Sequence, residues 1–287
     1  MDWVILSFGV ILVASANCLV ARKLLVKGIS GALINLINFF ACFVFFLLFA
    51  ALSGKQLVIP FSDLAAVIIL SVFFNYIGNV FYMKSIAGAP NPGYGLTIIK
   101  SNVIMTTLLA ALFLRSEISI KNVLAIIIVL VFMALVFFDN SAKSKSRSGG
   151  KWILPSVAAF FCFSFYTLSI KYLLERGVDS TVFLVYMCGA SAAIFYFEAK
   201  KARGKIFDVG ANSNFFLMFG AIASIAGTIF FTEAVKVAPN PGYVGAFDAA
   251  SSAVVVLGAA WLFKDHLSRS KLVGVLGVLS GLIVLLL

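Results

Sequence analysis

The stretch Ala89-Pro90-Asn91-Pro92-Gly93-Tyr94 occurs twice in the chain, the second time as Ala238-Pro239-Asn240-Pro241-Gly242-Tyr243. The two copies are 149 residues apart (238 − 89), and the same offset, applied without gaps, places Trp3 on Trp152. The chain is therefore a tandem duplication. A repeat of this length predicts two similar structural halves, and it is the first feature that a fold prediction must accommodate.

The composition predicts a membrane protein. Hydrophobic residues make up 62% of the chain and charged residues 11%, whereas soluble domains are nearer half apolar and a quarter charged. The net charge of +11 does not indicate nucleic acid binding, because the basic residues lie in short loops between apolar segments, as the positive-inside rule describes. A lipid-embedded chain that is also duplicated is typical of transporters.

The cysteines predict neither a disulfide nor a metal site. Each lies inside an apolar segment, and none has a CxxC or Cys/His spacing. Buried thiols of this kind act as small hydrophobic side chains. We therefore expect no metal and no cofactor. The four residues are Cys18, Cys42, Cys162 and Cys188.

Ten segments are long and apolar enough to cross a bilayer, which takes about 20 residues. Because backbone polar groups must be paired inside the hydrocarbon, these segments are expected to be helices. The fold class is thus an all-α membrane protein with ten transmembrane helices in two five-helix repeats. The predicted spans are 3–21, 29–52, 63–86, 93–113, 121–138, 152–173, 180–199, 213–236, 243–263 and 270–287.

The composition also predicts a linker between the two repeats. Residues 141–151 are rich in Ser, Gly and Lys and lack any apolar periodicity, so we predict a basic cytoplasmic linker there. The first repeat then covers residues 1–140 and the second covers 152–287.

An odd number of spans per repeat requires the second repeat to be inverted relative to the first. The loop charges agree, since 15 of the 22 Lys and Arg residues lie in one set of alternate loops and six lie in the other set. The positive-inside rule makes the first set cytoplasmic and places both termini outside. We expect the chain to be integral to the cytoplasmic (inner) membrane of a prokaryote.

The duplicated stretch predicts two sharp helix starts. An asparagine followed by proline places an N-cap side chain before a proline at the first helical position. A rigid hinge is one function for these turns, and attraction of an anion to the positive end of the helix is another. The candidate hinge residues are Asn91, Pro92, Gly93, Asn240, Pro241 and Gly242.

The chain resembles the drug/metabolite transporter superfamily, specifically its ten-helix EamA-type members. The resemblance rests on the duplication, on the small residues that open the fourth and ninth spans, and on two charged turns, Arg115-Ser116-Glu117-Ile118-Ser119 and Lys264-Asp265-His266-Leu267-Ser268. It implies alternating access and a central cavity lined by the first, third, fourth, sixth, eighth and ninth spans, with the fifth and tenth peripheral. It also implies cytoplasmic termini, but the loop charges predict the opposite, and we follow the charges.

Two ionisable side chains lie well inside predicted spans, Lys100 in the fourth and Asp248 in the ninth. Such residues are rare in hydrocarbon and mark functional sites. An in-plane pseudo-twofold axis brings these two spans together near the midplane, so the side chains are expected to meet or to face one cavity. A purely structural ion pair is one interpretation. A site for a charged or zwitterionic metabolite is the second, and a protonatable Asp248 that couples transport to protons is the third.

Uncharged polar side chains complete the predicted substrate site. Asn17 and Tyr166 occupy equivalent repeat positions, and their divergence suits an asymmetric solute. Polar residues also hold membrane helices together, so some of them have only a packing role. The remaining candidates are Asn79, Tyr82, Asn102 and Ser251.

Lys84 and Glu233 also occupy equivalent positions, near the ends of the third and eighth spans. They are candidate gate charges on opposite sides of the membrane. Snorkelling or helix capping is the simpler interpretation.

The sequence therefore predicts a secondary transporter that moves a small polar or zwitterionic metabolite, such as an amino acid. A proton-coupled multidrug or amine exporter is the alternative within the same class. An intramembrane enzyme is the alternative from another class, and the spans lack the motifs that such an enzyme needs. A GxxxG motif at Gly277 and Gly281 is a weak dimerisation signal, so the partners are the bilayer, the small-molecule substrate and, for a homodimer, a second copy.

Overall fold

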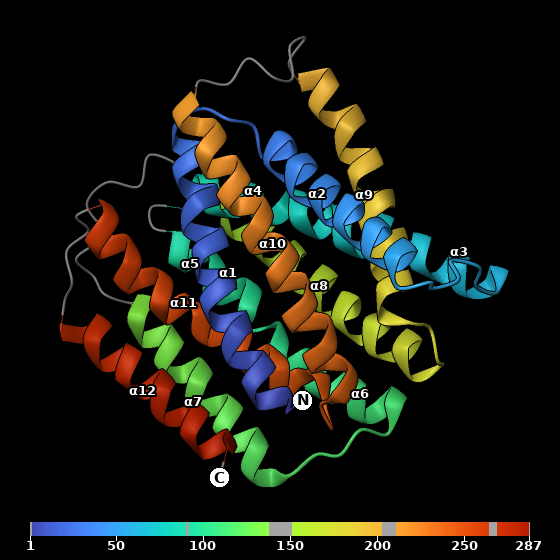
Figure 1. The fold of residues 1–287 in the computed structure, drawn as a ribbon. Helices are drawn as coiled ribbons and strands as arrows, with labels where there is room; N and C mark the ends of the chain where they lie inside the picture. The colour runs from blue at the N-terminus through green and yellow to red at the C-terminus, as the bar shows by residue number, and fades with distance from the viewer. Residues whose placement is uncertain (1, 90–91, 138–150, 203–210, 264–268, 287) are drawn as a thin grey trace.

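The computed structural model describes residues 2–89, 92–137, 151–202, 211–263 and 269–286, and every regular element in these ranges is a helix (Figure 1). The first repeat contains α1 (Trp3–Val26), α2 (Gly31–Leu52), α3 (Phe61–Ile69), η1 (Leu70–Tyr76), α4 (Ile77–Gly88), α5 (Pro92–Lys100), α6 (Asn102–Leu114) and α7 (Ile120–Phe137). The second contains α8 (Ile153–Glu175), α9 (Ser180–Ala202), α10 (Ala211–Val237), α11 (Pro241–Phe263) and α12 (Arg269–Leu286).

These helices confirm the predicted all-α membrane fold. Eight helical segments of the described ranges are long and apolar enough to cross a membrane, and Ile120–Phe132 within α7 is a shorter apolar helix. The third predicted span consists of α3, η1 and α4, and the fourth consists of α5 and α6. The sequence did not predict either subdivision. Most of the predicted linker lies outside the described residues, and the repeat boundaries stay a prediction.

The helix contacts between the repeats stay the same when each helix is replaced by its equivalent in the other repeat. Helix α1 packs against α10 and α11, while its repeat equivalent α8 packs against α4 and against α5 and α6. Helices α2 and α9, which are equivalent, pack against each other, and so do α7 and α12. Figure 1 shows these last two pairs at opposite ends of the molecule. Because each pair maps onto its exchanged partner, the repeats are related by a pseudo-twofold axis.

The two Ala-Pro-Asn-Pro-Gly-Tyr turns lie at opposite ends of α1. Near the end of α1, Arg22 Nη2 donates a hydrogen bond to the carbonyl of Ala89, the first residue of the first stretch. At the start of α1, the Trp3 ring lies 6.2 Å from the ring of Tyr243 in the second turn. A duplicated segment found at both ends of one spanning helix requires the two repeats to run in opposite directions.

Equivalent glycines let the repeats approach closely. A Cβ on Gly78 of α4 would lie 2.9 Å from Phe163 Cε1 and 3.0 Å from Cys162 Cβ of α8. A Cβ on Gly227 of α10 would lie 2.9 Å from Val13 Cγ1 of α1. Val13 and Cys162 are themselves equivalent (162 − 13 = 149), so both crossings use the same small residue against the same helix position.

The GxxxG motif packs within the chain. A side chain at Gly277 would collide with the ring of Phe132, and one at Gly281 would approach Val129, both on α7. Small residues allow such close helix approach in membranes. The motif therefore explains the α7–α12 pair without a second copy of the chain, and homodimer formation stays a prediction with no support from this motif.

Candidate functional site

A cavity of about 280 Å³ lies between the two repeats. Its walls come from α1, α2, η1, α4, α5, α6, α8, α10 and α11, together with Met187 of α9. All eight residues that the sequence nominated for substrate binding line it: Asn17, Asn79, Tyr82, Lys100, Asn102, Tyr166, Asp248 and Ser251. The structure therefore places the candidate residues of both repeats around one cavity. Substrate binding itself stays a proposal.

The resemblance implied a cavity without the second span, and this expectation was wrong. Asn35, Asn38, Phe39 and Cys42 of α2 line the cavity. Two asparagines three residues apart in an apolar span were the available signal, because both fall on one helix face. The equivalent span α9 contributes only Met187 among the described lining residues, so the cavity departs from the symmetry of the fold.

Lys100 and Asp248 form an ion pair on the cavity wall. Their side chains are 17% and 19% exposed, which shows that the pair is mostly desolvated yet still reaches open space. Lys100 is the last residue of α5, and the chain turns at Ser101 before α6 begins. The cation therefore lies at a break in a spanning helix, which is where secondary transporters place their binding groups.

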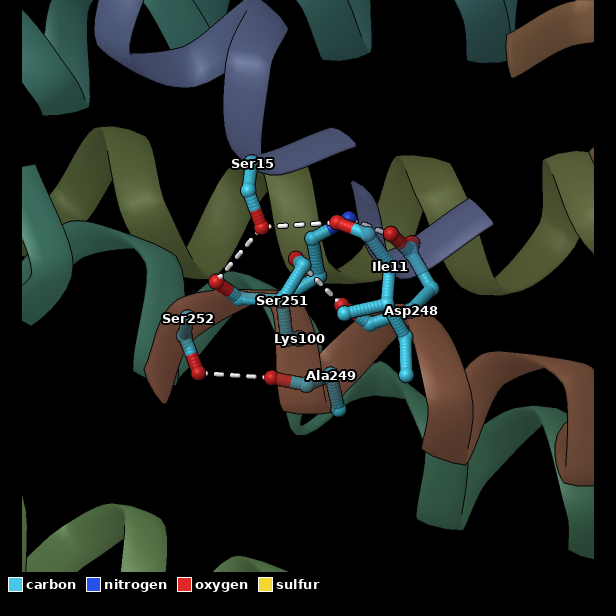
Figure 2. Close-up of polar contacts among 7 residues, drawn as sticks. All are labelled: Ile11, Ser15, Lys100, Asp248, Ala249, Ser251 and Ser252. Atoms are coloured by element: carbon cyan, nitrogen blue, oxygen red, sulfur yellow. Dashed lines mark hydrogen bonds and ion pairs between the residues drawn. The ribbon is translucent and has the colours of Figure 1, made fainter. Parts of the chain in front are cut away.

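Asp248 lies on the unbroken helix α11, and two serines donate hydrogen bonds to backbone carbonyls of this helix. Ser251 Oγ donates a hydrogen bond to the carbonyl of Asp248 at 2.5 Å. Ser15 Oγ of α1 donates to the carbonyl of Ile11 at 2.6 Å and to that of Ser251 at 3.1 Å, as Figure 2 shows. These bonds join α1 to α11 beside the ion pair, so the two helices form one supported wall.

The third span presents two asparagines to the cavity, Asn75 from the π-helical segment η1 and Asn79 from α4. Asn79 Nδ2 donates to the carbonyl of Asn75 at 2.8 Å and to its Oδ1 at 3.0 Å. Asn75 Nδ2 in turn donates to Ser191 Oγ of α9 at 2.9 Å. π-helical turns frequently occur at functional sites, and here the segment contributes Asn75 to the cavity wall.

An aromatic wall faces the same cavity. The ring of Phe163 lies 6.4 Å from that of Tyr82 and 6.5 Å from that of Tyr166, in edge-to-face arrangements. Tyr166 Oη donates to Met187 Sδ at 3.8 Å, which is a weak hydrogen bond. Its repeat equivalent Asn17 instead accepts a hydrogen bond from Ser224 Oγ at 3.5 Å. Equivalent positions thus carry different chemistry on opposite walls.

The predicted gate residues lie apart from the cavity wall. Lys84 is exposed, and its Nζ lies 5.7 Å from the centroid of the Phe81 ring. Glu233 accepts a hydrogen bond from Ser180 Oγ at 2.5 Å, which ties α10 to the start of α9. The structure does not bring these two charges together, and their gating role stays a prediction.

The second duplicated turn has the predicted helix start. Asn240 Oδ1 accepts a hydrogen bond from the backbone amide of Gly242 at 2.8 Å, and Pro241 is the first residue of α11. A side chain at Gly242 would collide with Thr107 of α6, so the helices meet closely there. In the first turn, Pro92 opens α5, whereas Asn91 and the surroundings of Gly93 lie outside what the structure describes.

A basic side chain clamps each duplicated turn, and sequence reasoning had assigned both of these residues only to loop charge. Arg22 Nη1 donates to the carbonyl of Ala87 at 3.0 Å, and Arg22 Nη2 donates to that of Ala89 at 3.5 Å. Lys171 Nζ donates to the carbonyls of Lys236 and Ala238 at 3.0 and 2.8 Å. Each atom pair is repeated at the offset of 149, because 171 − 22, 236 − 87 and 238 − 89 are all equal. A comparison of the two repeats for basic residues would have found them.

Within the described ranges, no group of three His, Cys, Asp or Glu residues is arranged to hold a metal ion. The four cysteines are free thiols. The second charged turn, which contains His266, lies outside the described residues. The chemistry that the cavity offers is therefore that of an ion pair, amides, hydroxyls and aromatic rings.

Two inverted five-helix repeats around a shared polar cavity define a membrane transport protein. The chain belongs to the EamA-like transporter family, which it matches over residues 1–138 and 150–287. This confirms the resemblance drawn from the duplication and the charged turns.

Two further comparisons agree. The chain is 23% identical over 265 residues to a protein of Archaeoglobus fulgidus named "Uncharacterized transporter", with 91% of this chain and 90% of that protein covered. It also matches a solved crystal structure with a TM-score of 0.80 at 14% identity, covering 98% of this chain and 94% of the other. At that identity the match shows a common fold.

Proposed function

We propose that this protein is a secondary transporter that moves a small zwitterionic metabolite by alternating access. The observation that carries the proposal is the Lys100–Asp248 ion pair on the cavity wall. A zwitterion offers a carboxylate to Lys100 and an ammonium to Asp248, so it replaces one ion pair with two. A solute with a single charge would leave one of the two side chains unpaired in a desolvated site, which is costly.

The size of the cavity supports a small solute. Pockets that enclose drug-sized ligands measure about 300–1,000 Å³, whereas this cavity measures about 280 Å³. The cavity therefore lies at the lower end of this range, which suits a metabolite of amino-acid size. The substrate class is therefore drawn from both the charges and the volume.

Alternating access is supported by the position of the site between the repeats. Lys100 belongs to the first repeat and Asp248 to the second, so any movement of one repeat against the other changes the distance between the two charges. A substrate that bridges the charges is then coupled to that movement. Rocking of one repeat against the other around a midplane site is the usual mechanism of such folds.

One observation favours a second candidate, the proton-coupled exporter of amines. The rings of Tyr82, Phe163 and Tyr166 lie on the wall of the same cavity as Asp248. Aromatic faces attract organic cations. In this alternative Asp248 binds the amine or a proton, and Lys100 serves as its partner when the site is empty.

Transport by the purified protein in liposomes tests the proposal. We expect counterflow exchange of radiolabelled zwitterionic amino acids and no comparable exchange of singly charged amines or phosphorylated metabolites. An applied pH gradient separates the two candidates, because the proton-coupled exporter requires accumulation of amines driven by the gradient. Exchange of amines alone, with no exchange of any zwitterion, would overturn the proposed substrate class.

The orientation in the membrane is a separate proposal, supported by the 15-to-6 distribution of Lys and Arg between the two sets of loops. We expect both termini to face outward in the cytoplasmic membrane of a prokaryote. An alkaline phosphatase domain fused after Leu287 is then active, because the enzyme folds only outside the cytoplasm. An inactive fusion together with an active green fluorescent protein fusion at the same residue would reverse the assignment.

A further inference from the structure

Two cavity side chains at equivalent positions of the repeats make the same bond. Asn79 of α4 and Thr228 of α10 are equivalent (228 − 79 = 149), and both line the cavity. Asn79 Nδ2 donates to the carbonyl of Asn75 at 2.8 Å, and Thr228 Oγ1 donates to the carbonyl of Ser224 at 2.7 Å. Each repeat therefore uses a cavity side chain to bond the carbonyl four residues before it.

These bonds decide which hydrogen-bonding groups remain for a solute. A carbonyl only accepts, so the amide nitrogen of Asn79 must face Asn75, and it also donates to Asn75 Oδ1 at 3.0 Å. A threonine hydroxyl carries a single hydrogen, which Thr228 donates to Ser224. Both side chains therefore present acceptors to the cavity, because their donors are already engaged.

The Asn79 acceptor is accessible from the cavity. Asn79 Oδ1 has no hydrogen-bond partner among the described residues, and it is not one of the unpaired side-chain atoms there that protein covers. Thr228, which is half-buried like Asn79, has one further weak contact, with Cys42 Sγ at 4.0 Å. Thr228 therefore supplies the equivalent acceptor from the second repeat.

The two acceptors lie on either side of the ion pair. The repeat equivalent of Lys100 is position 249, next to Asp248, so the pair meets close to the pseudo-twofold axis. The same axis exchanges Asn79 and Thr228. Both acceptors therefore flank the place where the proposed solute holds its charges.

We propose that Asn79 Oδ1 and Thr228 Oγ1 accept hydrogen bonds from the ammonium of the solute, whose charge Asp248 binds. The inference rests on the proposed function and narrows its substrate class to zwitterions with a primary ammonium. Three N–H donors match one carboxylate and two neutral acceptors. An N-methylated ammonium has the same charge but fewer donors, so it leaves acceptors on the wall without partners.

The acceptors provide selectivity that the ion pair lacks. A site built to hydrogen-bond an N–H group rejects an analogue without it, because the protein groups are then left unpaired. Glycine, N-methylglycine, N,N-dimethylglycine and glycine betaine have the same two charges, while the N–H donors on their nitrogen fall from three to none. Binding across this series therefore measures the acceptors separately from the ion pair.

Ligand-induced thermal shifts of the purified protein test the inference without any assumption about the driving force. The probes are the glycine series and, for a larger side chain, L-leucine and N-methyl-L-leucine. We expect the wild type to bind the primary amines at least about tenfold more tightly than glycine betaine and N-methyl-L-leucine. In Asn79→Leu this preference should be lost. Leucine has nearly the volume of asparagine and leaves no new room for a methyl group, so the loss reports hydrogen bonding.

Thr228→Val removes the second acceptor at constant shape and should also weaken the preference, which keeps the test decisive if Asn79→Leu does not fold. Asn79→Thr should retain the preference, because Thr228 makes the same bond at the equivalent position. Thr107→Val is the matched control. Thr107 Oγ1 donates to the carbonyl of Val103 at 2.7 Å in the same i−4 pattern, but Thr107 is 2% exposed and is not among the residues that line the cavity. This variant should keep the preference.

Three results would overturn the two acceptors and leave the proposed function intact. They are equal binding of primary and N-methylated zwitterions by the wild type, an unchanged preference in both Asn79→Leu and Thr228→Val, and an equal loss in Thr107→Val. Binding of none of the zwitterions would instead remove the proposed function.

Discussion

Lys100→Met and Asp248→Asn should each lower the exchange of a zwitterionic solute by at least about 30-fold, which corresponds to the lower end of the 2–5 kcal/mol cost of truncating one partner of a buried charge pair. Each substitution removes one of the solute's two counter-charges and leaves the other side chain unpaired in a mostly desolvated site. The measurement is the initial rate of counterflow exchange in liposomes at equal amounts of reconstituted protein.

The charge-swapped variant Lys100→Asp/Asp248→Lys separates a solute site from a structural ion pair. Swapping restores the attraction between the two side chains, so the melting temperature should recover toward that of the wild type. Exchange should stay low, because the bound zwitterion would have to reverse its orientation against the amides and aromatic rings. Recovery of both stability and exchange would assign the pair a structural role only.

A second ion pair provides the control. Lys55 and Asp179 pair across the two repeats near the ends of α2 and α9, and neither lines the cavity. Their side chains are 34% and 39% exposed, so the pair contributes about 0–1 kcal/mol to stability. Lys55→Met and Asp179→Asn should leave exchange near the wild-type rate. A loss comparable to that of the Lys100 variant would show that exchange is sensitive to any lost ion pair.

Lys171→Met should destabilise the fold by about 2–4 kcal/mol, because it removes two charge-assisted hydrogen bonds to the end of α10. Lys171 is 5% exposed, and the variant leaves the carbonyls of Lys236 and Ala238 without this donor. Exchange should fall together with stability, because the clamp fixes the turn that starts α11 and so positions Asp248. Thermal unfolding of the purified protein and counterflow exchange are the two readouts.

The duplication supplies the rescue variant and the neighbourhood supplies the control. Lys171→Arg should retain stability and exchange, since Arg22 performs the same function at the equivalent position of the first repeat. Lys236→Met removes a positive charge from the same turn, but its side chain is exposed, so little change is expected. If Lys171→Met behaves like Lys236→Met, the clamp contributes nothing and the account of the turn is wrong.

The sequence predicts the fold to the level of helix order and repeat inversion. An offset of 149 with an odd number of spans leaves a single arrangement of the repeats, and the apolar segments fix the helices. Periodicity does not reveal the π-helical segment Leu70–Tyr76 or the break after Lys100, because both lie inside continuous apolar spans.

The sequence predicted those site residues whose side chains are unusual in a membrane span. A charge in an apolar span is conspicuous, and Lys100 and Asp248 were found for that reason. Asn35 and Asn38 were overlooked because an uncharged amide in a membrane helix is an ordinary packing residue, and only the folded structure shows that both line the cavity. Arg22 and Lys171 were counted among loop charges because both lie near the ends of their spans. Their hydrogen bonds to backbone carbonyls of another helix form only in the folded chain.

The central claim is that a zwitterionic solute binds between Lys100 and Asp248, and the doubly neutralised variant Lys100→Met/Asp248→Asn tests it most directly. Removal of both charges leaves no unpaired ion, so the variant should fold with stability close to that of the wild type. Its counterflow exchange of zwitterionic amino acids in liposomes should remain at least about 30-fold below the wild-type rate, because the solute has lost both counter-charges. A folded double variant that exchanges them at the wild-type rate would contradict the claim.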